Sequence, residues 1–137
     1  MTYVPYVDHI AERKRKEKIE ADRVVVSRIE CLRQAVDALQ HVTTRRDVRV
    51  AQLIAQETAR RKKYNAKFHW LPKFLHYSLD EEAIRKDYPR QIWEIYVENT
   101  RVVAACNSLL SVCRDSSLSE VSVVRRDWKL VKNFFKA

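Results

Sequence analysis

The sequence of 137 residues contains no glycine and only three prolines, at positions 5, 72 and 89. Glycine supplies the positive φ angles that tight turns and close backbone approaches require. Its absence argues against glycine-rich nucleotide loops, Rossmann turns and nucleophile elbows. The remaining composition is typical of helices that are joined by few and simple connections.

Long hydrophobic runs are also missing. No stretch approaches the roughly 20 apolar residues that a membrane-spanning helix needs, so we expect no transmembrane segment. The first 18 residues lack the apolar core of a secretory signal, and Asp8 and Glu12 depart from the acid-poor pattern of a transit peptide. We therefore expect no cleavable signal.

Cysteine is scarce, with three residues at positions 31, 106 and 113. Cys106 and Cys113 are seven residues apart, about 10 Å along a helix, which is too far for a disulfide. We interpret all three as reduced, small apolar residues of a protein in a reducing intracellular compartment.

Charge, in contrast, is abundant and unbalanced. Charged residues make up 33% of the chain, and 27 Lys and Arg against 18 Asp and Glu give a formal net charge of +9. The average charged fraction is about 25%. This excess favours polyanions or acidic partner surfaces without identifying one.

The first half of the chain has neither proline nor glycine between positions 6 and 71. We expect a charged N-terminal arm over 1–24, followed by a single helical domain over 25–137. One helix is predicted from about residue 8 to about residue 63, and a pair of helices hinged near Thr43 is the alternative.

The second half is predicted to begin with an irregular basic and aromatic connector over 64–77. Capping-box spacings at Ser78–Glu81 and Ser117–Glu120, with Pro89 in a first turn, predict helices over about 79–86, 90–114 and 118–135. The fold class expected is all-α: a long N-terminal helix or helical arm and a C-terminal helical hairpin, forming a small elongated bundle.

Apolar residues at helical spacing predict a packing seam. The front half shows a 4-3-4-3 spacing that is typical of one helix packing on another. The expected seam residues of the whole chain are Val25, Ile29, Leu32, Val36, Leu39, Val103, Leu110, Trp128 and Phe135.

Motifs for catalysis or metal binding are not evident. The four histidines and three cysteines form no Cys-x2-Cys, His-x3-His or Glu-x-x-His pair. The serines between 108 and 122 have no histidine near them in the sequence, and caps or links explain them. We expect no catalytic residue, no metal and no cofactor.

The strongest candidate for function is the segment 60–77, with six basic residues, five aromatic residues and no acidic residue. RNA could be bound by cations on phosphates and aromatic rings on unpaired bases. A membrane surface could take the aromatics at the headgroups and the lysines on anionic lipid. A structural interpretation has the cations end a helix and the aromatics pack over it. The candidate contact residues are Arg60, Arg61, Lys62, Lys63, Tyr64, Lys67, Phe68 and Trp70.

These patterns predict a non-catalytic structural or accessory subunit of a large multisubunit assembly, with a mitochondrial complex as the expected setting. Its partners would be neighbouring protein subunits, held by long amphipathic helices and basic surfaces. The alternative is an RNA-binding protein of a ribonucleoprotein such as an organellar ribosome. A weaker alternative is a cytoskeletal or axonemal packing protein, and peripheral membrane contact is a further option.

Overall fold

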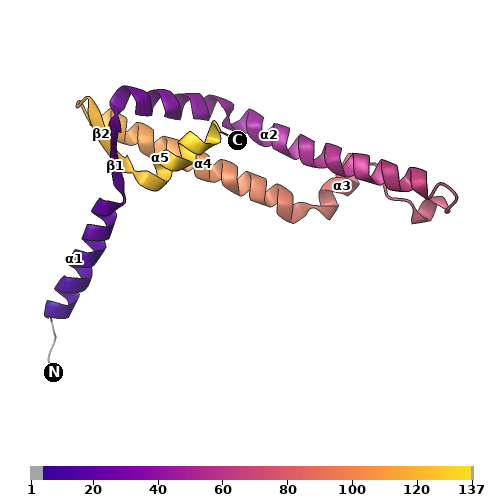
Figure 1. Ribbon diagram of the computed structural model, residues 1–137, viewed down its shortest axis with the longest axis horizontal. Coiled ribbons are helices and arrows are strands. Elements are labelled where there is room, and N and C mark those ends of the chain that lie inside the picture. Colours follow the sequence, from indigo (N-terminus) through magenta and orange to yellow (C-terminus); the bar gives the residue numbers. More distant parts are fainter. Residues whose placement is uncertain (1–4, 137) are drawn as a thin grey trace. The chain divides into compact units, whose positions relative to one another are not determined.

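The computed structural model describes residues 5–136, and this part of the chain is predominantly helical (Figure 1). It contains five α-helices, one 3-10 turn and a two-stranded sheet. The helices are α1 (Pro5–Ala21), α2 (Arg28–Lys67), α3 (Glu81–Asp87), α4 (Pro89–Asp115) and α5 (Arg125–Phe134), the 3-10 turn is η1 (Lys73–Leu75), and the strands are β1 (Arg23–Ser27) and β2 (Glu120–Val124). The all-α fold class predicted from the sequence is confirmed.

The chain forms two compact units. Unit 1 comprises Met1–Leu39 and Val102–Ala137, and unit 2 comprises Gln40–Arg101. The long helices α2 and α4 each contribute residues to both units. This division differs from the expected arm over 1–24 and domain over 25–137; residues 1–4 of that arm and residue 137 lie outside the described residues.

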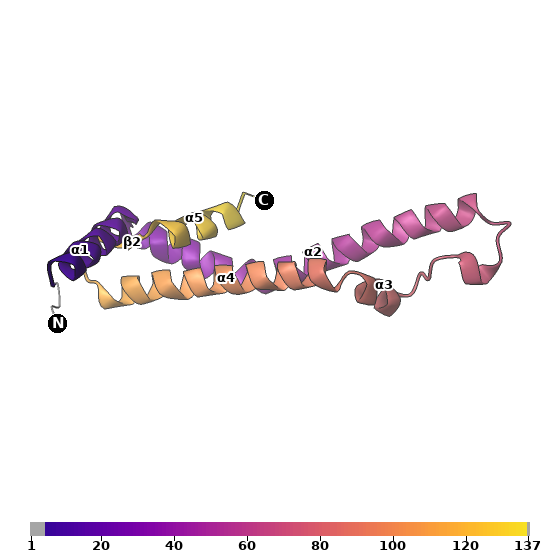
Figure 2. The ribbon, with the colours of Figure 1, turned by 90° about the horizontal axis from the view of Figure 1, so that it is seen from below.

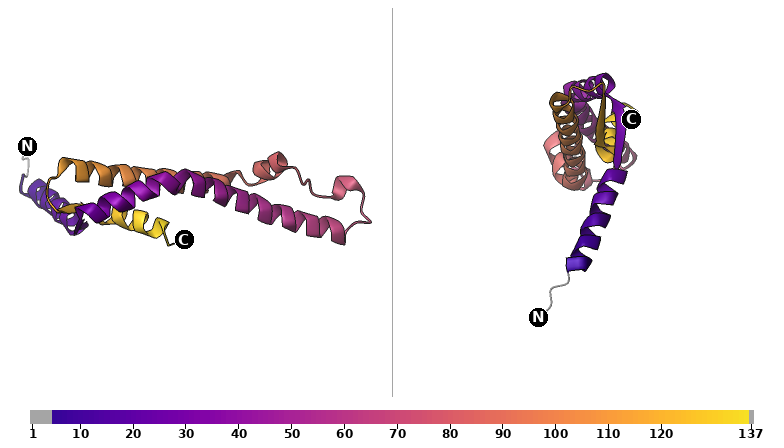
Figure 3. Two further views of the ribbon diagram at one scale, coloured as in Figure 1. Left: turned by 90° about the horizontal axis from the view of Figure 1, so that it is seen from above. Right: turned by 90° about the vertical axis from the view of Figure 1, so that its left-hand side faces the viewer.

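Unit 1 contains the antiparallel sheet, in which Arg23 pairs with Val124 and Ser27 with Glu120. Figures 1 and 3 show β1 and β2 side by side, with α5 following directly from β2. Runs of valine explain both strands, because a β-branched side chain loses χ1 freedom in a helix and packs well on a pleated surface. Along β2 the buried Val121 and Val123 alternate with the exposed Ser122.

Two predicted helices are therefore wrong in part. The helix expected from about residue 8 to 63 is interrupted by β1, and residues 118–124 of the helix expected over 118–135 belong to the link and to strand β2. The backbone N–H of Arg28 donates to the carbonyl of Ser119 (2.8 Å), and that of Arg125 donates to Asp22 (2.9 Å). The sheet thus holds the start of α2 against the end of the link that precedes β2.

The interior of unit 1 also joins α2 to α4. The guanidinium Nε of Arg28 donates to the carbonyl of Cys113 (2.9 Å), and the Cys113 thiol lies 3.9 Å from the carbonyl oxygen of Arg28. Small side chains make this close approach feasible, since Cys31, Ala35 and Ala38 on α2 are fully buried.

Unit 2 is built from the later part of α2, the connection after it, α3 and the beginning of α4. Its core consists of Val50, Ile54 and Ile84, with Tyr88, Ile92 and Ile95 packed against it. Figure 2 shows the connection after α2 returning the chain through η1 to α3. Helix α2 runs through Thr43 without a break, so the hinge that was the alternative is absent from this part of the described chain.

Candidate functional site

The candidate segment 60–77 occupies the last turns of α2 and the connection that follows. Helix α2 ends at Lys67, and the backbone N–H of Phe68 still reaches the carbonyl of Tyr64 (3.0 Å). Pro72 then takes an extended conformation, with φ −58° and ψ 149°, and opens η1. Because proline cannot donate a backbone hydrogen bond, it separates the helix from this single turn.

Arg61 is the centre of an ion-pair network and is only 3% exposed. Its Nε donates to Glu57 (2.9 Å), its Nη1 to the carbonyl oxygen of Ser78 (2.9 Å) and its Nη2 to Asp87 (2.6 Å). The planar fork of guanidinium donors suits such simultaneous contacts. Arg61 therefore ties α2 to the connection before α3 and to the end of α3.

Arg60 shares the carboxylate of Glu57. Its Nε and Nη2 donate to the two carboxylate oxygens at 3.0 and 2.6 Å. Hydrogen bonds from Arg60 and then Arg61 hold the pKa of Glu57 at about 2, well below its ordinary value. Two of the predicted contact residues are thus committed to carboxylates within the chain.

The aromatic side chains of the segment form a cluster. The ring centroids of Tyr64 and Phe68 are 4.7 Å apart, those of Tyr64 and Tyr77 are 4.8 Å apart, and those of Phe68 and Trp70 are 6.1 Å apart. The guanidinium groups of Arg60 and Arg61 each lie 5.4 Å from the ring centroid of Tyr77. Tyr64 and Phe68, predicted as stacking residues, are half-buried in this cluster.

Hydrogen bonds fix the connection itself. Asn65 makes two bonds with the backbone of Tyr77: its amide donates to the carbonyl (3.0 Å), and its side-chain oxygen accepts from the N–H (3.0 Å). The Nε2 atom of His76 lies 2.9 Å from the carbonyl oxygen of Phe68. The connection from Phe68 to Tyr77, which includes η1, is consequently held together at its two ends.

Three apolar side chains of this fixed loop are exposed: Trp70 (68%), Phe74 (83%) and Leu75 (49%). We call these three residues the loop patch. Lys67 and Lys73 neighbour it in the sequence, and Lys62 and Lys63 are exposed on α2. Sequence reasoning named Trp70 but missed Phe74 and Leu75, although the proline before η1 was a signal that the chain turns there.

The structure places none of the nine predicted seam residues among the buried ones. Val25 lies on β1 instead of a helix and is 67% exposed, Ile29 is 77% exposed, Val36 41% and Phe135 46%. The other five are half-buried: Leu32, Leu39, Val103, Leu110 and Trp128. The buried residues lie beside the predicted seam instead: Cys31, Ala35, Ala38, Val102, Ala105, Leu109, Val121 and Val131.

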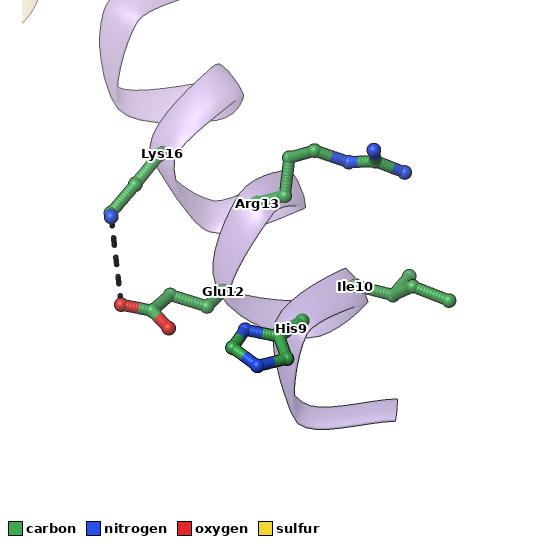
Figure 4. A pocket seen from close by; sticks show the side chains of 5 residues that line it. All are labelled: His9, Ile10, Glu12, Arg13 and Lys16. Carbon is green, nitrogen blue, oxygen red and sulfur yellow. Dashed lines mark ion pairs between the residues drawn. The ribbon is translucent and has the colours of Figure 1, made fainter. Parts of the chain in front are cut away.

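Two hollows in unit 1 have few features of a ligand-binding site. One, of about 520 Å³, is lined by Arg28, Leu32, Asn107, Leu110, Ser111 and Arg114. The other, of about 400 Å³, lies along α1, where Glu12 pairs with Lys16 at 3.6 Å. Figure 4 shows Ile10 and Arg13 pointing away from that ion pair, so successive turns of one helix form this hollow and do not enclose a ligand.

Residues 5–136 contain no group of three or more His, Cys, Asp or Glu side chains placed to hold a metal ion. No helix in the described part combines the length and apolar character that crossing a bilayer demands. Comparison of the chain with protein-family models, curated proteins and solved structures found no match.

Proposed function

We propose that this chain is a non-catalytic structural subunit of a larger protein assembly. The observation that carries the proposal is the apolar stripe of α2, which consists of Ile29, Leu32, Val36 and Leu39. Its 3-4-3 spacing is that of a helix packing on another helix. Ile29 is 77% exposed and Val36 41% exposed within the chain, and the other two are half-buried.

The stripe supports a partner because its members Ile29 and Val36 lie outside the buried core of unit 1. Cys31, Ala35 and Ala38 form the buried side of α2 in this unit, and each is 0% exposed. Ile29 and Val36, the exposed members of the stripe, gain little from packing within the chain. Contiguous exposed apolar surface of this kind marks sites of protein–protein interaction, and its spacing favours a helix of a neighbouring subunit.

The thiols and the charge support the setting that we propose. Cys31, Cys106 and Cys113 are buried and free, which supports a reducing compartment. The net charge of +9 favours acidic neighbours. A mitochondrial complex is the assembly that we propose.

RNA binding, the alternative expected from the sequence, has fewer groups to use than the sequence indicated. Arg60 and Arg61 are neutralised by Glu57 and Asp87. Phosphate contacts would depend on Lys62, Lys63 and Lys67. The experiment that tests the assembly therefore also tests for RNA binding.

The experiment follows the tagged full chain through native electrophoresis of cell extracts. The double variant Ile29→Asp, Val36→Asp replaces exposed side chains, so the fold should persist while the chain leaves the large complex. Val48→Asp is the matched control, because Val48 is 47% exposed on the same helix but lies off the stripe.

Three outcomes would contradict the proposal. The wild-type chain could migrate as a free 16.3 kDa protein, the two variants could behave alike, or ribonuclease treatment could release the wild-type chain. The third outcome would favour the ribonucleoprotein. Circular dichroism of both purified variants would verify that each remains helical.

A further inference from the structure

The loop patch of unit 2 has lysines beside it in the sequence, and the assembly proposal assigns no role to either. Phe74 is the most exposed large apolar side chain of the described residues, at 83%, and Trp70 and Leu75 lie on the same connection. Exposed apolar side chains that gather on one segment mark a site of interaction. We propose that the loop patch docks on the surface of an anionic lipid bilayer.

The charge around the patch complements such a surface. No acidic residue occurs between positions 60 and 77. Lys73 directly precedes Phe74 in the sequence, and the ammonium of Lys67 lies 5.5 Å from the ring centroid of Phe68. Because Glu57 and Asp87 already compensate Arg60 and Arg61, these lysines supply the uncompensated charge beside the patch. Lysine near an anionic membrane increases partitioning by about fivefold per residue.

The acidic residues that follow set the boundary of the docking surface. Leu79 is also exposed, at 44%, but Asp80, Glu81 and Glu82 come directly after it. Anionic lipid would repel these carboxylates, of which only Glu81 has an intrachain ion pair in the described structure, with Arg85. The surface that meets lipid therefore ends before Leu79.

The chemistry of the patch fits lipid better than nucleobases. Bases stack on flat aromatic faces, but the rings of Tyr64 and Phe68 are engaged with each other, and Leu75 offers no ring. A bilayer interface accepts tryptophan, phenylalanine and leucine alike, with lysine stems lying along the apolar region and their ammonium groups in the headgroups.

The loop that carries the patch has a fixed conformation before it meets lipid. The paired hydrogen bonds of Asn65 with Tyr77 and the contact of His76 with the Phe68 carbonyl hold the loop in shape. Docking then requires no folding step, and the entropic cost of ordering the loop has already been met within the chain.

Vesicle flotation of the full chain tests the proposal. We expect binding to phosphatidylcholine vesicles that contain phosphatidylserine, weakening with added salt, and little binding to phosphatidylcholine alone. The variant Phe74→Ser, Leu75→Ser should reduce binding about tenfold or more, and Lys73→Glu should reduce it severalfold. Trp93→Ser, at a 64% exposed position on α4, is the matched control and should bind like the wild type.

The proposal is overturned if the wild-type chain ignores anionic vesicles or binds neutral ones equally well. It is also overturned if the control variant loses as much binding as the loop variant. Competition by single-stranded RNA, with RNA binding abolished by the loop variant, would assign the patch to nucleic acid instead. The stripe variant Ile29→Asp, Val36→Asp should keep its lipid binding, which separates this test from that of the assembly.

Discussion

The guanidinium Nη2 of Arg61 lies 2.6 Å from a carboxylate oxygen of Asp87, and this contact joins α2 to the end of α3. The arginine is buried while the aspartate side chain is 59% exposed. Arg61, which the sequence suggested as a contact for an acidic partner, therefore stabilises unit 2 instead.

Replacing Arg61 by Met should lower the free energy of unfolding by about 2–3 kcal/mol, because Glu57 stays buried with one guanidinium partner fewer. The solvent exposure of Asp87 keeps the loss below that of a fully buried pair. Arg85→Met is the control, since its pair with Glu81 is exposed and should contribute at most about 1 kcal/mol. Urea denaturation measures both, and equal losses would mean that Arg61 has no special role.

Acid should destabilise the protein through Glu57. Its pKa is lowered to about 2 in the folded chain, from an ordinary 4.5, so the stabilisation is fully present above pH 4.5 and is lost as the pH falls toward 2. Glu57→Gln should flatten the pH dependence of the unfolding free energy in that window. An identical pH profile for wild type and Glu57→Gln would refute this linkage.

The small residues on the buried side of α2 should not tolerate enlargement. Ala35→Leu adds volume at a fully buried position and should cost about 1–3 kcal/mol of unfolding free energy. Val36→Leu, one residue further on at a 41% exposed position, should change stability by less than about 0.5 kcal/mol. Thermal or urea unfolding would show the reverse order if the predicted seam were the intrachain core.

Asn99 on α4 presents a buried side-chain oxygen that has no hydrogen-bond partner among the described residues. Replacing it with leucine removes an uncompensated polar atom and should raise the unfolding free energy by about 1 kcal/mol. Asn107→Leu, at an exposed position on the same helix, is the comparison and should have little effect. A destabilised Asn99→Leu would indicate that this oxygen has a partner in the native protein.

The three thiols should be almost inert in the folded chain, because each cysteine is 0% exposed. Burial raises the pKa of Cys31 to about 12 and that of Cys106 to about 11, so little reactive thiolate forms at mildly alkaline pH. Ellman's reagent should react slowly with native protein and rapidly with all three thiols in guanidinium chloride. Rapid reaction of the native chain would show that these cysteines are accessible.

Local preferences along the chain were sufficient to predict helices α3 and α4. Helix α3, expected over 79–86, spans Glu81–Asp87, and α4, expected over 90–114, spans Pro89–Asp115. Proline in a first turn acts within a few residues, and so do caps and the hydrophobic period. Such signals can be recognised in a single sequence.

The sheet could not be predicted in the same way. A two-stranded sheet depends on pairing between segments almost a hundred residues apart, such as Arg23 with Val124. The valines of β1 are compatible with either a strand or a buried helix until that partner is known.

The sequence by itself determined a glycine-free, helical and basic protein, because composition and short-range spacing decide those properties. The tertiary structure decided which side of α2 is buried, since close packing of helices favours alanine and cysteine over the larger apolar residues beside them. It also decided which cations of the segment 60–77 are free. Carboxylates brought close by the fold neutralise Arg60 and Arg61, and no local pattern records that proximity.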